Sequence, residues 1–169
     1  MPKRRIMGIV FAAAVAIAPS AASAQTAPPA KPAAKAPAKH VMVAPSDVKW
    51  GPGPASLPPG AQMAVLDGDP GKAGAPFVIR AKLPDGYQVP PHWHPTDENI
   101  AVLSGTFLLG SGNKFDEKAM TSLAAGGFAR MPKMMHHSAM AKGETVIQVH
   151  GVGPFAVTYV NPNDDPRKK

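Results

Sequence analysis

The sequence predicts an all-β protein in which a single domain folds as a closed barrel or jelly roll. No long helical period of apolar residues occurs between residues 41 and 162. Proline and glycine, 21 and 16 of them in the chain, interrupt this region about every eight to twelve residues, as the turns of a barrel require. Residues 77–83 alternate strictly between apolar and mixed positions. About eight strands are expected, and their closure would leave no exposed sheet edge.

The first 24 residues have the features of a Sec-type signal peptide. A basic start is followed by an unbroken apolar run over residues 6–18, and then by Ala22, Ser23 and Ala24 as small residues before a cleavage site. The apolar run is shorter than the about 20 residues of a membrane span, although an uncleaved anchor is the alternative. We therefore expect a periplasmic or secreted protein that begins at Gln25.

Residues 25–40 are expected to be a disordered linker, because proline, alanine and lysine offer nothing that can pack. Residues 41–162 have the length of one ordinary domain, and residues 163–169 form a basic tail. The chain has no cysteine, so neither a disulfide nor a lipidated cysteine is available, and packing must stabilise the domain, with help from a metal as an option.

The formal net charge of +7 does not indicate a nucleic-acid-binding protein. Nine of the 18 basic residues lie in residues 1–40 or among the last three residues. The other nine basic residues are fewer than the 11 acidic residues, all of which lie between these two ends of the chain, so this middle part is slightly acidic. No stripe of basic and aromatic residues occurs in it. We expect no nucleic-acid partner and no stable membrane insertion after signal cleavage.

The first elements of the domain follow from its turn residues. Residues 41–60 are rich in proline and glycine and are expected to form an arm over the barrel, with Trp50 as a packing plug. The apolar run 62–66 ends at a turn over residues 67–70, and the alternating strand 77–83 ends at the turn of Pro84, Asp85 and Gly86. Residues 99–109 form either one long strand or a strand pair broken at Ser104 and Gly105.

The second half of the domain continues this pattern. Residues 116–123 are the only stretch with a helical character, and it is short. The remaining predicted strands cover residues 125–131, beside a double glycine, and residues 145–150 and 155–160, which are joined by a turn over residues 151–154.

Two histidines one residue apart, His92 and His94, form the first candidate site. A spacing of two places both imidazoles on the same face of an extended chain. Glu98 follows four residues later and is expected on the neighbouring strand. Histidine and carboxylate side chains that face the same point are candidate metal ligands.

The residues Gly86, His92, His94, Glu98 and Gly105, with their spacing, resemble the first signature of the cupin superfamily. The second signature is matched in part: Gly126, Pro132 and His137 are in register, whereas Met134 stands where glycine is expected and Ala141 where asparagine is expected. The resemblance covers most of the domain and implies a small, RmlC-like, single-domain cupin with a jelly-roll β-barrel.

The resemblance implies that His92, His94, Glu98 and His137 hold one divalent transition metal. Imidazole and carboxylate ligands suit iron, manganese, nickel, copper, cobalt or zinc, and four protein ligands leave coordination positions free. His136 is the alternative to His137 if the loop is shifted by one residue. Four methionines lie near the second signature and suggest copper handling as an alternative: Met131, Met134, Met135 and Met140. Core packing explains methionine more often.

His150 is a candidate acid or base near the metal if the face that it shares with Gln148 points inward, and a histidine at a strand end if it does not. The expected pocket walls are Phe77, Ile79, Val102 and Phe107.

The resemblance implies a metal-dependent, dioxygenase-like oxidoreductase that acts on a small organic substrate, or an isomerase that needs an acid–base pair. The alternatives are a non-catalytic module of the cell envelope that binds a metal or a small ligand, and a structural role with a vestigial site. A homodimer through edge strands is a further expectation.

Overall fold

The computed structural model describes residues 40–169 of the chain. The predicted signal peptide and all but the last residue of the predicted linker lie outside the described residues. No helix among residues 40–169 is both long enough and apolar enough to cross a membrane.

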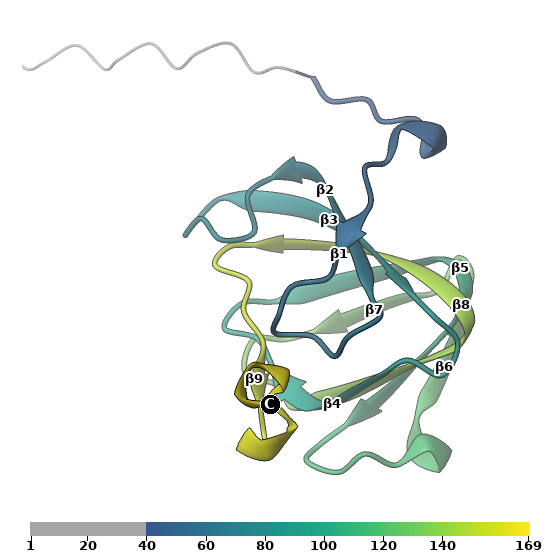
Figure 1. Cartoon of the computed structure of the whole chain (residues 1–169), viewed down its shortest axis with the longest axis vertical. Helices are drawn as coiled ribbons and strands as arrows, with labels where there is room; N and C mark the ends of the chain where they lie inside the picture. Colours follow the sequence, from purple (N-terminus) through teal and green to yellow (C-terminus); the bar gives the residue numbers. More distant parts are fainter. Residues whose placement is uncertain (1–39) are drawn as a thin grey trace, which may run out of the picture. The chain divides into compact units, whose positions relative to one another are not determined.

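Nine strands form one strongly curled, antiparallel sheet, which confirms the predicted all-β jelly roll (Figure 1). The strands are β1 (Gly51–Pro52), β2 (Gln62–Gly68), β3 (Pro76–Leu83), β4 (Gln88–Trp93), β5 (Glu98–Ser111), β6 (Thr121–Ala124), β7 (Phe128–Met131), β8 (His137–Val152) and β9 (Thr158–Tyr159).

Two long strands, β5 and β8, connect the halves of the barrel. They pair with each other over almost their whole lengths, from Glu98 opposite Gly151 to Ser111 opposite His137. The second half of β8 also pairs with β3, and its first half pairs with β4. Each long strand therefore belongs to both halves of the sheet and bends where it passes from one to the other, close to the register shifts around Ser104.

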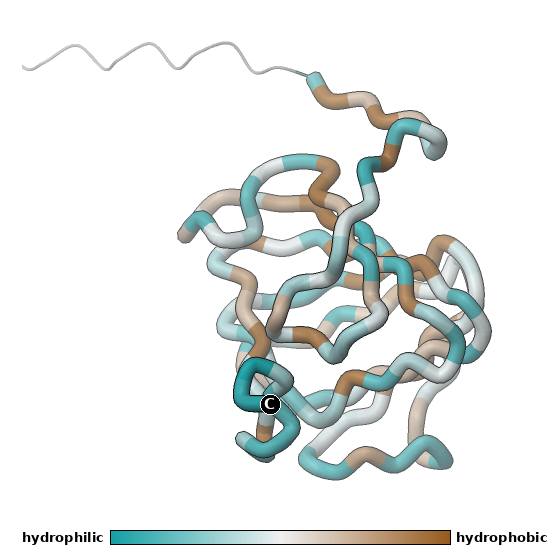
Figure 2. Tube along the Cα trace, in the orientation of Figure 1, coloured by the Kyte–Doolittle hydropathy of each residue, from teal (hydrophilic) through white to brown (hydrophobic). Residues whose placement is uncertain are grey.

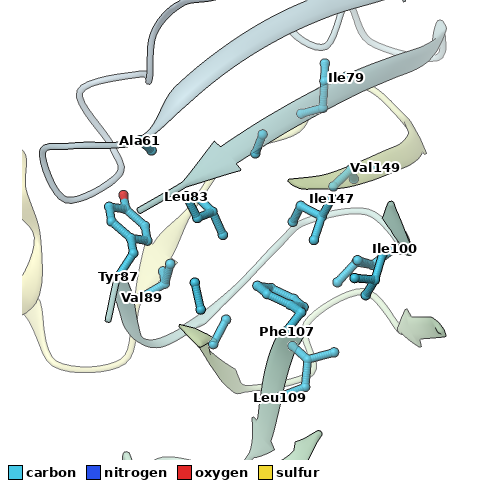
Figure 3. Packing of buried hydrophobic residues seen from close by; sticks show 14 of the residues in the cluster. Ala61, Ile79, Leu83, Tyr87, Val89, Ile100, Phe107, Leu109, Ile147 and Val149 are labelled. Atoms are coloured by element: carbon cyan, nitrogen blue, oxygen red, sulfur yellow. The ribbon is translucent and has the colours of Figure 1, made fainter. Parts of the chain in front are cut away.

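The core lies inside the curl of the sheet. The predicted alternation of β3 is confirmed, because Phe77, Ile79, Ala81 and Leu83 are buried and the residues between them are less so. Side chains from the surrounding strands meet them, as Figure 3 shows for Ile100, Phe107, Leu109, Ile147 and Val149 among others. Hydrophilic residues instead occupy the C-terminal turns (Figure 2).

Three predicted elements differ from the structure. The helical stretch 116–123 is one turn of 3-10 helix, η2 (Glu117–Ala119), followed by strand β6. Of the predicted strand 155–160 only β9 is a strand, and the N–H group of Phe155 before it donates to the carbonyl of Pro70. The last long strand begins at His137 and includes the predicted strand 145–150.

The arm and the tail are both structured in the described chain. The arm contains the 3-10 turn η1 (Pro45–Asp47) and strand β1, and its Trp50 is half-buried, with Lys82 Nζ 4.7 Å from the ring centroid. Most of the predicted basic tail lies in two 3-10 turns, η3 (Pro162–Asp164) and η4 (Pro166–Lys168). Arg167 pairs with the buried Asp165 and donates to the carbonyl of Val157, which fixes the tail to the barrel.

Candidate metal centre

Three histidines meet inside the barrel. His92 lies on β4 opposite His137, the first residue of β8, and His94 follows directly after β4. The ring centroid of His92 is 4.3 Å from that of His137 and 5.0 Å from that of His94. One nitrogen of each ring lies within 4.8 Å of one nitrogen of the other two, and all three side chains are buried. These three buried histidines could hold a metal ion.

Backbone carbonyls fix the orientation of each ring. Nδ1 of His92 is 2.7 Å from the carbonyl oxygen of Pro90, Nδ1 of His94 is 2.8 Å from that of Ala156, and Nδ1 of His137 is 3.0 Å from that of Met135. A carbonyl oxygen can only accept, so each Nδ1 must carry the proton and donate. In the neutral rings the lone pair is therefore on Nε2, which is the arrangement of a histidine that ligates a metal.

Glu98, the first residue of β5, adds a carboxylate to the three rings. Its Oε2 lies 3.3 Å from Nε2 of His137 and 3.5 Å from Nε2 of His94. Nε2 of His94 is buried and has no hydrogen-bond partner in the described structure. A buried nitrogen lone pair without a donor is unfavourable, and a carboxylate beside it adds a second acceptor. This set of donor atoms fits a cation at their centre.

Burial keeps the imidazoles of His92 and His94 neutral at physiological pH. Burial lowers the pKa of His92 to about 3, and the neighbouring rings of His137 and His94 add to the effect. Burial also lowers the pKa of His94, against the opposing influence of Glu98. For Glu98, burial alone would raise the pKa, but the adjacent ring of His137 and the nearby rings of His94 and His92 outweigh it and the pKa is lowered. Neutral imidazoles and an ionised carboxylate are the forms that bind a metal.

A cavity of about 190 Å³ opens from the four side chains into the barrel. The other lining residues are almost all apolar, and Ser56 is the only polar side chain among them that is not part of the four. Two of the predicted wall residues, Ile79 and Phe107, line the cavity, whereas Phe77 and Val102 are buried in the core beside it. The cavity is suited to a small and largely apolar ligand.

The two remaining candidate histidines lie elsewhere. His136 is half-buried and its Nδ1 is 2.6 Å from Oδ1 of Asn113, so the alternative to His137 is not part of the cluster. His150 is exposed and hydrogen-bonded to the side chain of Gln148, so it does not line the cavity as a candidate acid or base, and the alternative of a histidine at a strand end describes it. Strand β8 turns its more apolar face, Ile147 and Val149, into the barrel, which places His150 outside.

The sequence did not predict several contacts that shape the site. Phe155 stacks on the ring of His94, with centroids 4.3 Å apart and an angle of 17° between the planes. The three carbonyls that fix the rings belong to backbone groups, two of them in the immediate neighbourhood of the histidine and one, that of Ala156, 62 residues away. Every residue type has a backbone carbonyl, so these contacts cannot be predicted from the residues present. For Phe155 the only signal in the sequence was the predicted turn over residues 151–154, which returns the chain to the barrel.

A jelly-roll barrel with buried histidines from β4 and β8 inside it is the arrangement of a cupin. The sequence matches the family described as the ChrR cupin-like domain over residues 38–156, and the chain therefore belongs to that family. A comparison with curated proteins finds no match.

Solved structures of low sequence identity share the fold. A protein provisionally named an acetylacetone dioxygenase from Methylibium petroleiphilum PM1 is 19% identical with a TM-score of 0.59, and the match covers 78% of this chain and 88% of that one. The polyketide cyclase RemF from Streptomyces resistomycificus is 20% identical with a TM-score of 0.57, covering 77% and 92% of the two chains. An RmlC-like cupin from Shewanella frigidimarina NCIMB 400 is 14% identical with a TM-score of 0.52, covering 69% and 94%.

Proposed function

We propose that this protein is an exported metal-dependent oxidoreductase, similar to a dioxygenase, that acts on a small organic molecule. The observation that carries the proposal is the cluster of three buried imidazoles, whose outer nitrogens donate to carbonyls and whose inner nitrogens face an apolar cavity. Among the described residues that line the cavity, Ser56 is the only polar side chain besides this cluster and Glu98.

In this proposal Glu98 is the fourth ligand, beside His92, His94 and His137. When bound, a divalent transition metal such as iron, manganese, nickel, copper, cobalt or zinc would supply a Lewis acid with free coordination positions and, for the redox-active ions, electron transfer. The protein's own contribution is to hold the three rings in one tautomer, to keep those of His92 and His94 neutral by burial and to surround the open positions with apolar side chains.

The cavity favours metal-centred chemistry over acid–base isomerisation. Among its lining side chains, no titratable group remains once the four candidate ligands are taken, and His150 lies outside. An isomerase or epimerase needs a separate acid and base within reach of the substrate. The volume of about 190 Å³ is below the about 300–1,000 Å³ of pockets for drug-sized ligands, so the proposed substrate is small.

The same lack of polar side chains also supports a second candidate, a non-catalytic module of the cell envelope that holds a metal or a small ligand. Both candidates predict metal binding, and only the enzyme consumes a co-substrate. Two of the neighbours in fold are named as a dioxygenase and a cyclase, and they share the fold alone with this chain.

Metal analysis and oxygen uptake test the proposal. Protein purified from the periplasm of an expressing bacterium should contain about one transition metal per chain, and His94→Ala should remove it because His94 Nε2 then no longer faces the site. Oxygen uptake with phenolic and carboxylate substrates that is lost in His94→Ala supports the enzyme. Metal binding without uptake for any redox-active metal favours the binding module, and equal metal content in both proteins contradicts the site.

Export is tested separately. A mature N-terminus at Gln25 in the periplasmic fraction is the expected result, because the small residues of positions 22–24 precede it. Retention of the protein in the cytoplasm with its N-terminus intact would contradict this part of the proposal and leave the metal site unaffected.

A further inference from the structure

One loop forms a thin wall between the cavity and solvent. Residues 54–60, here called the cavity loop, connect β1 to the segment that leads into β2. Pro54, Ser56 and Leu57 line the cavity, while Ala55 and Gly60 in the same loop are exposed. In the described chain the wall is therefore a single layer of residues at this place. Elsewhere the lining comes mainly from strands of the sheet, which are held in place by pairing on both sides or by the core.

The loop has a closed base and a stabilised first turn. The N–H group of Gly53 donates to the carbonyl of Ala61 at 2.9 Å, directly beside the β1–β2 pairing of Pro52 with Gln62. The N–H group of Leu57 donates to the carbonyl of Pro54, also at 2.9 Å. The base of the loop is therefore fixed by the β1–β2 pairing, and its first turn is closed by a hydrogen bond of its own.

Two tyrosines, the only ones in the chain, attach the tip of the loop to the barrel. The hydroxyl of Tyr87 donates to the carbonyl of Pro58 at 2.5 Å, and the hydroxyl of Tyr159 donates to the carbonyl of Ser56 at 2.8 Å. Figure 3 shows the Tyr87 hydroxyl directed towards the segment that carries Ala61. Burial raises the pKa of both phenols, that of Tyr159 to about 12, so both hydroxyls remain donors over the physiological range.

The tyrosines connect the loop to the strands of the candidate metal centre. Tyr159 lies on β9 opposite His92 on β4, with ring centroids 6.0 Å apart, and Tyr87 directly precedes β4. The position of the loop is thus set relative to the rings that would hold the metal, and Ser56 and Leu57 of the loop line the same cavity as those rings.

We propose that the cavity loop, attached by Tyr87 and Tyr159, selects the ligand of the metal centre, with Leu57 limiting its size and Ser56 supplying a hydrogen bond. This inference rests on the proposed function, because it names the part of the chain that chooses the substrate of that site. It identifies the substrate as an apolar small molecule with one group that binds the metal and one hydroxyl or carbonyl that reaches Ser56.

A chain-length series of carboxylates tests the role of Leu57. Formate to octanoate are titrated onto the Co²⁺-loaded protein, and the visible spectrum of the ion reports binding. Affinity should rise with each buried methylene until the chain meets the loop, and then fall. In Leu57→Ala the optimum should move to a longer chain, and the first carboxylate that wild type rejects should bind about tenfold or more tightly. The matched control Leu103→Ala removes an exposed leucine of β5 and should leave the optimum unchanged.

A hydroxylated pair tests the role of Ser56. Wild type should bind 3-hydroxybutyrate at least as tightly as butyrate. Ser56→Ala should prefer butyrate by about tenfold, because the hydroxyl of bound 3-hydroxybutyrate then has no hydrogen-bond partner. An equal ratio in both proteins overturns the assignment of Ser56, and an unchanged chain-length optimum in Leu57→Ala overturns that of Leu57.

Hydrogen exchange tests the attachment without any metal. In metal-free Tyr159→Phe the amide of Leu57 should exchange about tenfold faster or more, while that of Ile147 in the core of β8 should be unchanged. Equal acceleration at both amides would show a general loss of stability and overturn the attachment. A protein that binds no Co²⁺ contradicts the proposed function. In that case the chain-length optimum is measured on the metal-free protein, by NMR titration with 1-alkanols from methanol to octanol.

Discussion

At the scale of single residues, the adjacent histidines at the start of β8 have different partners. His137 is almost fully buried, and its Nε2 lies 3.3 Å from Glu98. His136 contacts the side chain of Asn113 instead. The difference arises where the strand begins, because β8 starts at His137 and His136 belongs to the segment before it.

Loss of the hydrogen-bond partner of a metal ligand lowers metal affinity by about 10–100-fold. We expect His137→Gln to lower the affinity by more than this, because the ligand itself is lost. The matched control His136→Gln should bind metal like wild type. Calorimetric titration of both variants with Zn²⁺ measures the difference. Equal affinities in the two variants, or a larger loss in His136→Gln, would contradict the assignment of His137.

Met134 occupies a backbone conformation that favours glycine. Its φ is +63°, in the left-handed region, where a side chain costs about 1–2 kcal/mol. The sequence motif expects glycine at this position, and the structure shows the physical reason. The N–H group of Met134 donates to the carbonyl of His94 at 2.8 Å, so the turn adopts this conformation next to the candidate metal centre.

Met134→Gly should therefore raise the free energy of unfolding by about 0.5–1 kcal/mol, after the greater freedom of glycine in the unfolded chain is subtracted. Met135→Gly, at the next position with an ordinary φ, should lower it. Urea denaturation of the metal-free variants measures both changes. Destabilisation of the two variants by the same amount would contradict the strain at Met134.

At the scale of elements, the bend of β5 depends on Gly105. Its φ is +75°, and a Cβ atom added there would lie only 2.4 Å from the carbonyl oxygen of Glu144 and 2.5 Å from Oγ1 of Thr145. Thr145 is fully buried and its hydroxyl bridges the two long strands, accepting from the N–H group of Thr106 and donating to the carbonyl of Thr106. The neighbour cannot move without breaking these bonds.

Gly105→Ala should consequently destabilise the protein by about 3 kcal/mol or more, since an unfavourable φ and a clash with backbone add up. Gly143→Ala is the matched control, because Gly143 has a φ of +73° and no atom within 4 Å of the added Cβ. Its loss should be only about 1–2 kcal/mol. Thermal or urea denaturation compares the two, and similar losses would show that the φ angle alone decides.

The same strands show how far the sequence could predict the site. The spacing of His92, His94 and Glu98 was sufficient to place three side chains together, because the alternation of β4 and the turn before β5 are local. The position of His150 was left open, since alternation says which residues share a face and not which face is inside. The apolar pair Ile147 and Val149 decides it once the strand is packed.

Contacts between distant segments could not be predicted in this way. The carbonyl of Ala156 and the ring of Phe155 reach His94 only because the segment after β8 folds back across the barrel. The cavity loop was interpreted as part of an arm, and its role as a cavity wall depends on the hydroxyls of Tyr87 and Tyr159. Such contacts follow from the closure of the barrel and carry no local pattern.

At the scale of the whole molecule, the buried histidines make stability depend on pH. The folded-state pKa of His92 is about 3, against 6.5 for a free side chain, because burial disfavours the charged ring. Between these two values the unfolded chain binds one proton more than the folded chain at this position. The free energy of unfolding then rises with pH. The contribution of His92 is therefore complete above about pH 6.5 and is lost as the pH falls towards 3.

The metal-free protein should lose about 1.4 kcal/mol of unfolding free energy per pH unit from His92 alone below pH 6.5. The lowered pKa of His94 acts in the same direction, and the lowered pKa of Glu98 adds a loss below its ordinary value of 4.5. Urea denaturation at pH 7.5, 6.5, 5.5 and 4.5 measures the slope. In His92→Asn, which has no group that titrates there, the slope between pH 6.5 and 4.5 should fall by the share of His92.

Metal binding should stabilise the folded protein further, because the folded cluster binds the ion and the unfolded chain does not offer a formed site. At pH 7.5 a Zn²⁺ concentration 100 times the dissociation constant should raise the free energy of unfolding by about 2.7 kcal/mol. Since burial lowers the pKa of His92 to about 3 and also lowers that of His94, most of this effect should persist at pH 5.5. Urea denaturation with and without Zn²⁺ measures it, and an equal zinc effect in wild type and His92→Asn would mean that the metal binds somewhere other than the three buried rings.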